Sequence, residues 1–423
     1  MRLAPALAAT LLAACPTAPV DPPAANWDVA LLQTELAVDL ADPDAPTAVA
    51  TLTFDDAASA SVDVAGLDVH EVTSEGAPVD FVLTDGRLDV ALPSPTVDVS
   101  YSLQRADLFE GWMVNGSTVT WPAFCGNVVP CRPHPREASR FGVTVTGTDS
   151  VAIAPVDSVL PGPAYQLAFA TGPYERTELG VTPGGVSLFH WAPLASVVPA
   201  NNGTADLLAV MTWLETTLGP YPWGDEAGAV QVDWGPGAIG GMEHHPFWHV
   251  SRAAMTRRTV HAHEAAHAWF GDGVRLACWE DLVLSEGLAT YLAARAQEAA
   301  VSAERGAEVW ADYEEELLAI LAEPGRDRIV WPETCDEVDV LSDLFDRVLY
   351  LRGAFFLRDY AELVGAAALD AALGAFVGAR LGTAASFDDL LAHLDEATGV
   401  DPRPLAITWL RTLGAPTGFP GSR

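Results

Sequence analysis

The stretch "HAHEAAHAWF" (residues 261–270) places three histidines and one glutamate in a run that is otherwise small or apolar. Its alanines favour an α-helix, on which residues four apart lie on the same face about one turn from each other. His263 and His267 therefore present two imidazoles to a single point, as two ligands of a tetrahedral metal ion must. His261 lies about 200° from His263 around the same axis and is excluded as a ligand.

A catalytic zinc ion usually takes three protein ligands and leaves its fourth position to water. Glu286 in "LVLSEGLATY" (282–291) is the next candidate, because eighteen residues separate it from His267. That separation suits a helix, a reversal and a second helix that runs past the first. Glu264 lies beside His263 and can reach the water of the metal as a general base without being a ligand. The sequence thus predicts one Zn²⁺ per chain and hydrolytic chemistry.

This stretch has two other interpretations. The first is a histidine-rich helix that is packed for structural reasons, because H-E-x-x-H alone has a real false-positive risk. The second uses "HAH" (261–263) as a metal-binding pair on a barrel strand. The alanine-rich, helical flanks argue against the second, and the position of Glu286 favours a metal site over the first.

Length and charge exclude several classes of function. The chain has 423 residues, enough for about two domains, and 57 Asp and Glu against 22 cationic residues, all of them arginine. Its formal net charge of −35 would repel nucleic acid and anionic lipid surfaces. Nucleic-acid binding is therefore not expected, and we expect a monomer.

The N-terminus reads as a targeting segment that is not part of the fold. Arg2 is followed by a short apolar run, and "LAAC" (12–15) resembles the bacterial lipobox, in which the cysteine carries lipid. We expect residues 1–14 to be a lipoprotein signal peptide, Cys15 to be lipidated and residues 15–26 to be a linker. The protein would then be extracytoplasmic and anchored to a bacterial membrane, the outer membrane or cell surface more than the inner one. An ordinary secretory signal is the alternative.

Four further cysteines fit an oxidising compartment. Of the three possible pairings, we favour Cys125 with Cys131, which are close in sequence, and Cys278 with Cys335. Four free buried thiols are the alternative.

The pattern of apolar residues changes once along the chain. Residues 27–190 alternate apolar and polar positions between short Gly, Pro, Asp and Ser turns, which favours an antiparallel β-sandwich-like domain. Residues 191–423 have mainly helical spacing with a small strand-like region at 228–245. The expected fold is α+β with two domains. The segments that predict strands are 47–54, 79–93, 96–103 and 140–147, and those that predict helices are 204–219, 288–300, 313–325 and 367–382.

Several motifs together resemble the gluzincin aminopeptidases related to aminopeptidase N, whose pattern is H-E-x-x-H, eighteen residues, then E. The resemblance covers most of the mature chain and implies a thermolysin-like catalytic domain at 191–423, one zinc ion and a peptide substrate with a free N-terminus. The motifs are "VPCRPHPREASRFGVTVTG" (129–147), "LGPYPWG" (218–224), "GGMEHH" (240–245), "HEAAHAWFGD" (263–272), "WEDLVLSEGLATY" (279–291), "LYLRGAFFL" (349–357) and "ITWLRTLGAP" (407–416).

The resemblance also implies a role for individual residues. Zinc would be held by His263, His267 and Glu286, with Glu264 as the general base, and Tyr350 would donate a hydrogen bond to the oxyanion. Tyr350 as a plain core tyrosine is the alternative.

The substrate would lie along the "GGMEHH" strand. Glu243 would bind its free α-amino group. Gly240, Gly241 and Met242 would line its backbone, since glycine leaves room for close approach. Asp281 would orient a zinc-binding histidine or cap a helix.

Three departures from the family pattern leave other functions open. His244 stands where the family has Asn, and "TWPAFCGNVV" (120–129) lacks a Gln or Glu that helps relatives bind the amine. The chain also stops just past the catalytic domain, which would leave a more open site. A zinc endopeptidase or other amide hydrolase is therefore one alternative, and an inactive surface-tethered binding protein is another. The second ranks last, because the chain keeps the base and all three ligands.

Overall fold

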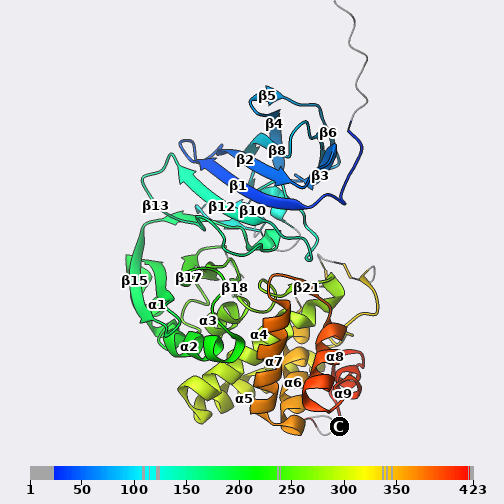
Figure 1. Ribbon diagram of the computed structural model, residues 1–423. Helices are drawn as coiled ribbons and strands as arrows, with labels where there is room; N and C mark the ends of the chain where they lie inside the picture. The colour runs from blue at the N-terminus through cyan, green and yellow to red at the C-terminus, as the bar shows by residue number, and fades with distance from the viewer. Residues whose placement is uncertain are drawn as a thin grey trace, which may run out of the picture.

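The computed structural model has a β-rich half and a helical half that stack end to end (Figure 1). The predicted signal peptide (1–14) and the lipidation site Cys15 lie outside the described residues. The described residues are 23–106, 110–113, 115–120, 124–235, 238, 240–335, 338–339, 342–343, 346–417 and 419.

The N-terminal half is built on a six-stranded sheet in the order β12-β1-β2-β8-β4-β5. Its strands are β1 (Leu31–Asp39), β2 (Thr47–Phe54), β4 (Leu67–Ser74), β5 (Ala77–Pro78), β8 (Thr96–Leu103) and β12 (Arg140–Thr146). Neighbours pair antiparallel, except that β12 pairs with β1 in parallel. An entirely antiparallel domain was expected. The parallel pair arises because β12 returns to the sheet edge after a connection of about a hundred residues, and only a long connection permits it.

A second, three-stranded sheet covers the first and closes the sandwich. It contains β3 (Ser59–Asp63), β7 (Arg87–Ala91) and β6 (Phe81–Thr84). The core between the sheets comes from alternate residues, such as Val97, Val99 and Tyr101 of β8, which are buried while their neighbours are half-buried. The smaller strands are β9 (Arg105–Ala106), β10 (Gly111–Met113), β11 (Thr118–Val119), β13 (Val151–Ile153) and β14 (Ala170–Gly172).

The helical half carries a five-stranded sheet in the order β15-β16-β17-β19-β18. Its strands are β15 (Tyr174–Val181), β16 (Ser187–Pro193), β17 (Glu226–Val232), β18 (Gly241–Met242) and β19 (Phe247–Ser251). The expected boundary between residues 190 and 191 thus falls inside β16, and the change of sheet occurs near Tyr174. Strand periodicity shows which residues are buried but not which sheet a strand joins. The remaining pair is β20 (Arg275–Leu276) with β21 (Ala384–Ala385).

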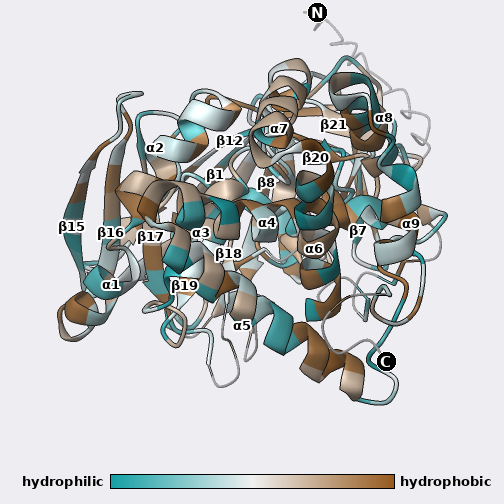
Figure 2. Ribbon diagram, turned by 90° about the horizontal axis from the view of Figure 1, so that it is seen from below, coloured by the Kyte–Doolittle hydropathy of each residue, from teal (hydrophilic) through white to brown (hydrophobic). Residues whose placement is uncertain are grey.

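Nine helices in the described residues pack around this sheet, and α4 and α6 lie side by side near the centre of the helical half (Figure 2). Each predicted helical segment contains or overlaps one of them. The helices are α1 (Val197–Gly203), α2 (Leu207–Leu218), α3 (Arg258–Ala266), α4 (Glu286–Ala296), α5 (Ala303–Ala322), α6 (Arg347–Val364), α7 (Ala366–Arg380), α8 (Phe387–Thr398) and α9 (Arg403–Leu410). In the described part of the chain no helix alone has the length and apolarity to span a membrane. Only α6 and α7 together meet that criterion, and they are bent by 117°.

Two disulfides join the cysteines as predicted. Cys125 is bonded to Cys131 within the β-rich half, and Cys278 is bonded to Cys335 in the helical half. The second bond ties the segment before α4 to the segment before α6.

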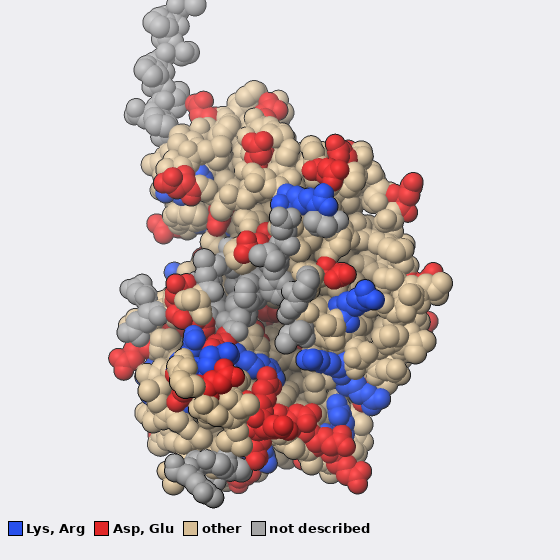
Figure 3. Space-filling model, turned by 180° about the vertical axis from the view of Figure 1, so that it is seen from behind, with Lys and Arg blue, Asp and Glu red and all other residues tan. Residues whose placement is uncertain are grey.

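Acidic side chains are spread over both halves of the surface. Seen from behind, arginine side chains gather with acidic ones around a hollow in the helical half (Figure 3). Since the chain has no lysine, every cation in this region is a guanidinium.

Candidate metal centre

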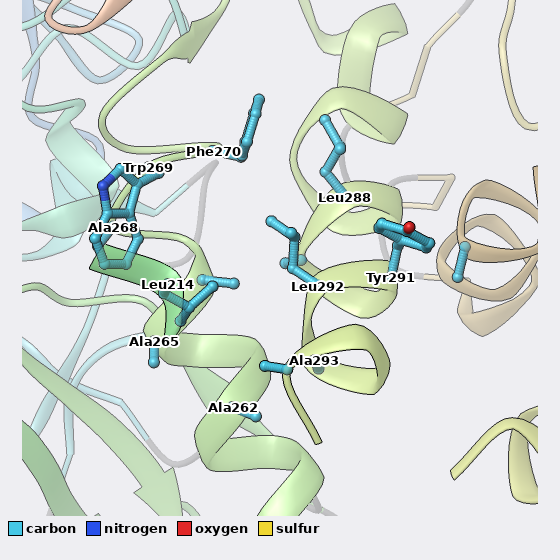
Figure 4. Close-up of a cluster of buried hydrophobic side chains, with 14 of the residues drawn as sticks. Leu214, Ala262, Ala265, Ala268, Trp269, Phe270, Leu288, Tyr291, Leu292 and Ala293 are labelled. Carbon is cyan, nitrogen blue, oxygen red and sulfur yellow. The ribbon is translucent and has the colours of Figure 1, made fainter. Parts of the chain in front are cut away.

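Helix α3 carries the H-E-x-x-H residues and packs closely against α4. Ala262 and Ala265 of α3 are both buried, and Ala262 lies on the side of the helix that faces Ala293 of α4 (Figure 4). Alanine suits this contact because it favours helix and its small side chain lets two backbones approach. The packing fixes how the histidines of one helix meet the glutamate of the other.

The three predicted ligand side chains, those of His263, His267 and Glu286, converge on one point, which is called the metal point below. His263 Nε2 lies 3.0 Å from Glu286 Oε2 and 3.1 Å from His267 Nε2, and the third side of the triangle measures 3.5 Å. A tetrahedral zinc ion with bonds of about 2.0–2.1 Å holds its ligand atoms about 3.3 Å apart. The triangle therefore has the dimensions of one face of a zinc tetrahedron.

The other nitrogen of each imidazole is turned away from this point. His267 Nδ1 lies 3.0 Å from the carbonyl oxygen of Phe270 and 3.2 Å from the hydroxyl of Ser285, and His263 Nδ1 lies 3.3 Å from the hydroxyl of Thr290. A proton donated from Nδ1 to Phe270 leaves Nε2 with a free lone pair, as a metal ligand needs. Sequence reasoning did not find these contacts. Thr290 stands four residues after Glu286 on the same face of α4, and that spacing was the available signal.

Helices α4 and α6 cross at two glycines, and this crossing brings Tyr350 to the site. A Cβ on Gly353 of α6 would lie 2.6 Å from the Cα of Gly287 on α4, so the two helices touch backbone to backbone there. Gly287 follows Glu286 and Gly353 stands three residues after Tyr350. The ring of Tyr350 consequently stacks on that of His263, with centroids 5.8 Å apart and planes 19° apart.

Burial governs the charge state of the site. Burial raises the pKa of Glu264 and of Tyr350 well above their usual values, so the Tyr350 hydroxyl keeps its proton as a hydrogen-bond donor. Burial works against ionisation of Glu286 as well, but the imidazoles of His267 and His263 hold its pKa low. If all three buried glutamates ionise, their negative charge exceeds what the two imidazoles can offset, and a divalent cation would balance it.

Glu243 lies at one end of the site. It is buried, and its carboxylate, that of Glu264 and an imidazole nitrogen of His267 lie within 4.8 Å of one another. Burial raises the pKa of Glu243 to about 7. Gly241 stands two residues before Glu243, and a Cβ at that position would lie 2.6 Å from the carboxylate of Glu264, so a larger residue would collide with it.

These side chains open into a pocket of about 990 Å³. Its walls come from β18 and the residues before it, from α3, and from α5 and α6. Gly240, Gly241 and Met242 line it as predicted, and a Cβ on Gly240 would meet open space. The pocket is also lined by residues that sequence reasoning missed, among them the polar or charged Thr256, Arg257, Arg305, Asp312, Glu316 and Arg347.

Asp281 does not touch either zinc-site histidine. Its carboxylate accepts hydrogen bonds from the backbone N–H groups of Phe387 at 2.8 Å and Cys278 at 3.2 Å, which caps the short 3₁₀ helix Trp279–Leu284. The prediction that Asp281 orients a histidine is thus wrong, and its alternative role as a cap is the one observed. The cap steadies the segment that leads into α4 and Glu286.

We expect Asp281→Ala to lower the free energy of unfolding by about 1–3 kcal/mol, because it leaves the buried N–H of Phe387 and the part-buried N–H of Cys278 without acceptors. Chemical denaturation measures this loss. Zinc content should stay at the wild-type level under native conditions, since the imidazole contacts are untouched. Loss of zinc without loss of stability would restore the histidine-orienting role.

The remaining histidines near the site are structural. His245 contacts the Tyr221 hydroxyl at 2.9 Å and the carbonyl oxygen of Glu264 at 2.8 Å. His244, which replaces the family's Asn, is buried, and its Nδ1 lies 2.9 Å from the carbonyl oxygen of Tyr165 in the β-rich half. His261 contacts the carbonyl oxygen of Met255 at 3.0 Å, away from the metal point.

Comparison with protein families agrees with this geometry. Residues 246–410 match the peptidase family M1 domain. The match to the M1 domain includes α3, α4 and α6, and so contains the three converging ligands, Glu264 and Tyr350. Glu243 and the glycines before it precede the matched stretch.

Curated relatives align with the same part of the chain. Aminopeptidase N of Streptomyces lividans is 32% identical over 164 residues, which is 38% of this chain and 19% of that protein. Aminopeptidase M1-A of rice is 30% identical over 171 residues, or 39% of this chain and 19% of the relative. The chain thus matches about a fifth of the length of these relatives.

Solved structures share the fold over a much longer stretch. An M1 zinc metallopeptidase from Deinococcus radiodurans superposes with a TM-score of 0.75 at 23% identity, covering 91% of this chain and 95% of that one. The same protein has been solved bound to a Tyr-Ser-Ala substrate. Yeast LTA4 hydrolase gives a TM-score of 0.78 at 18% identity, covering 92% and 69%. At these identities the similarity establishes the two-domain M1 peptidase fold.

Proposed function

We propose that the protein is a zinc aminopeptidase that removes N-terminal residues from peptides. One observation carries the proposal: the triad of His263, His267 and Glu286, the unligated Glu264 and the buried Glu243 line a single pocket. The family match and the M1 relatives support it.

The residues present fit a zinc ion. Two imidazole nitrogens and one carboxylate oxygen are the donor set of many catalytic zinc sites, and their triangle has the required size. When bound, zinc supplies a Lewis acid that lowers the pKa of a water ligand toward neutrality.

Two side chains around this point have separate tasks: Glu264 transfers protons, and Tyr350 stabilises the negative charge that develops on the substrate. Glu264 accepts the proton of the attacking water as the carbon–oxygen bond forms, and returns it to the leaving amine as the peptide bond breaks. Gly241 leaves the space in which the Glu264 carboxylate stands. The Tyr350 hydroxyl donates a hydrogen bond to the oxygen on which negative charge develops.

Glu243 gives the site its preference for a free N-terminus. Because its carboxylate is buried, the ionised form lacks the solvation of bulk water whether or not substrate is present, and this raises its pKa. An ammonium group placed beside it restores the favoured ionised form and makes a charge-assisted hydrogen bond. A blocked, uncharged N-terminus cannot do so.

Paired peptides test this assignment. We expect kcat/KM for a free alanyl peptide to exceed that for its N-acetylated form by at least about tenfold, and Glu243→Gln to remove most of the difference. The comparison uses steady-state kinetics on both peptides with both proteins, with Glu315→Gln on the exposed face of α5 as control. Equal or better cleavage of the acetylated peptide by the wild type would instead indicate an endopeptidase.

Three further parts of the proposal concern context. The helical half is arranged as in thermolysin-like peptidases, with the ligands on two successive helices, and the protein acts as a monomer. It is exported and tethered to the outer membrane or cell surface through lipid on Cys15. The two disulfides are in keeping with an oxidising compartment outside the cytoplasm.

A further inference from the structure

The substrate pocket extends along α3, away from Glu243. Arg257, Val260, Glu264 and His267 recur at intervals of three or four residues, so they share one face of the helix and its N-cap. Arg257 precedes His263 by six residues, which corresponds to about 9 Å along the axis. The pocket therefore has an end beyond the metal point, at the start of α3.

The two ends bind different parts of a peptide. Glu243 clusters with Glu264 and His267, at the C-terminal end of the shared face. A substrate held there by its amine passes the metal point and continues toward Val260 and Arg257. An extended chain advances about 3.3–3.6 Å per residue, so Arg257 lies two to three residues beyond the cleaved bond.

The charge at this far end is unbalanced. Four arginines line the pocket, and three of them are paired: Arg258 with Asp206 at 2.7 Å, Arg305 with Glu308 at 3.1 Å and Arg347 with Glu316 at 2.9 Å. Arg257 is exposed, and its guanidinium makes no ion pair or hydrogen bond with any residue that the structure describes.

The opposite wall does not supply a carboxylate for Arg257. Asp312 on α5 also lines the pocket, but no ion pair joins its carboxylate to Arg257 in the part of the chain that the structure describes. The guanidinium of Arg257 offers its donors to the pocket.

We propose that Arg257 is a specificity-determining residue that binds a carboxylate in the leaving part of the peptide, two to three residues after the cleaved bond. The inference rests on the proposed aminopeptidase function and deepens it. The carboxylate is either the C-terminus of a short peptide or an acidic side chain at that position. A guanidinium suits both, because its fork matches the two oxygens.

Matched peptides test the proposal. Wild-type protein should cleave Ala-Ala-Ala about 10- to 100-fold better in kcat/KM than its C-terminal amide, mainly through a lower KM. Arg257→Gln should bring this ratio close to 1, and Arg257→Lys should restore part of it. Arg252→Gln, which removes an exposed arginine outside the pocket, should keep the wild-type ratio.

Ala-Ala-Asp-NH2 separates the two sources of the carboxylate. Cleavage of this amide as fast as the free tripeptide assigns a side-chain carboxylate, and cleavage as slow as the neutral amide assigns the C-terminus. A ratio that is the same in Arg257→Gln and the wild type would overturn the role of Arg257. Failure of the wild type to release nitroaniline from alanyl p-nitroanilide, which has no residue beyond the bond, would instead count against the aminopeptidase function.

Discussion

Glu264→Gln should lower kcat by about 10²–10⁴ while the protein still binds zinc. The Glu264 carboxylate is buried near the metal point, but it is not one of the three ligands, whose atoms form a triangle without it. Its loss therefore removes the proton acceptor and leaves the ligands in place. Steady-state turnover of alanyl p-nitroanilide, together with zinc analysis of the same samples, measures both effects.

Glutamine keeps the size of the side chain, so the gap beside Gly241 stays filled. Glu315→Gln serves as the matched control, because Glu315 is exposed and lies outside the pocket. Wild-type turnover by the Glu264→Gln protein would exclude Glu264 as the base. Loss of zinc in this variant would mean that Glu264 acts as a ligand.

Tyr350→Phe should lower kcat by about 10²–10³ and leave KM nearly unchanged, because the hydroxyl contacts only the charge that develops in the transition state. The ring stacks on His263 and would remain in place without its oxygen. Steady-state kinetics over a range of substrate concentrations separates the two constants.

Tyr291→Phe is the control for this variant. Tyr291 is buried on α4, away from the pocket, and its hydroxyl has no hydrogen-bond partner in the described part of the chain. Both substitutions delete one tyrosine hydroxyl and keep the ring, so any general effect on packing should be similar. An unchanged kcat in Tyr350→Phe would assign Tyr350 to packing alone.

The metal point could be predicted because its geometry is local. Two histidines four residues apart meet on any α-helix, and Glu286 needed only a second helix to pass the first. The contact that fixes the approach of Tyr350 is different, because Gly287 and Gly353 are 66 residues apart in the chain. Only the fold shows that these two glycines cross.

The features that could not be predicted correctly share one physical cause, because each depends on contacts between residues far apart in the chain. The pairing of β12 with β1 and the sheet to which β15 and β16 belong depend on long connections, which leave no trace in strand periodicity. The sequence is compatible with two roles for Asp281, because an acidic residue near a helix start suits both. Its acceptor contact with Phe387, more than a hundred residues away, decided between them.

Zinc analysis of the purified wild-type and His263→Ala chains tests the central claim most directly. We expect one zinc ion per wild-type chain after dialysis against metal-free buffer, and far less in His263→Ala, because only two of the three ligands remain. A wild-type chain that folds normally yet binds no zinc, or a His263→Ala chain that retains the full amount, would contradict the metal site and the enzyme built on it.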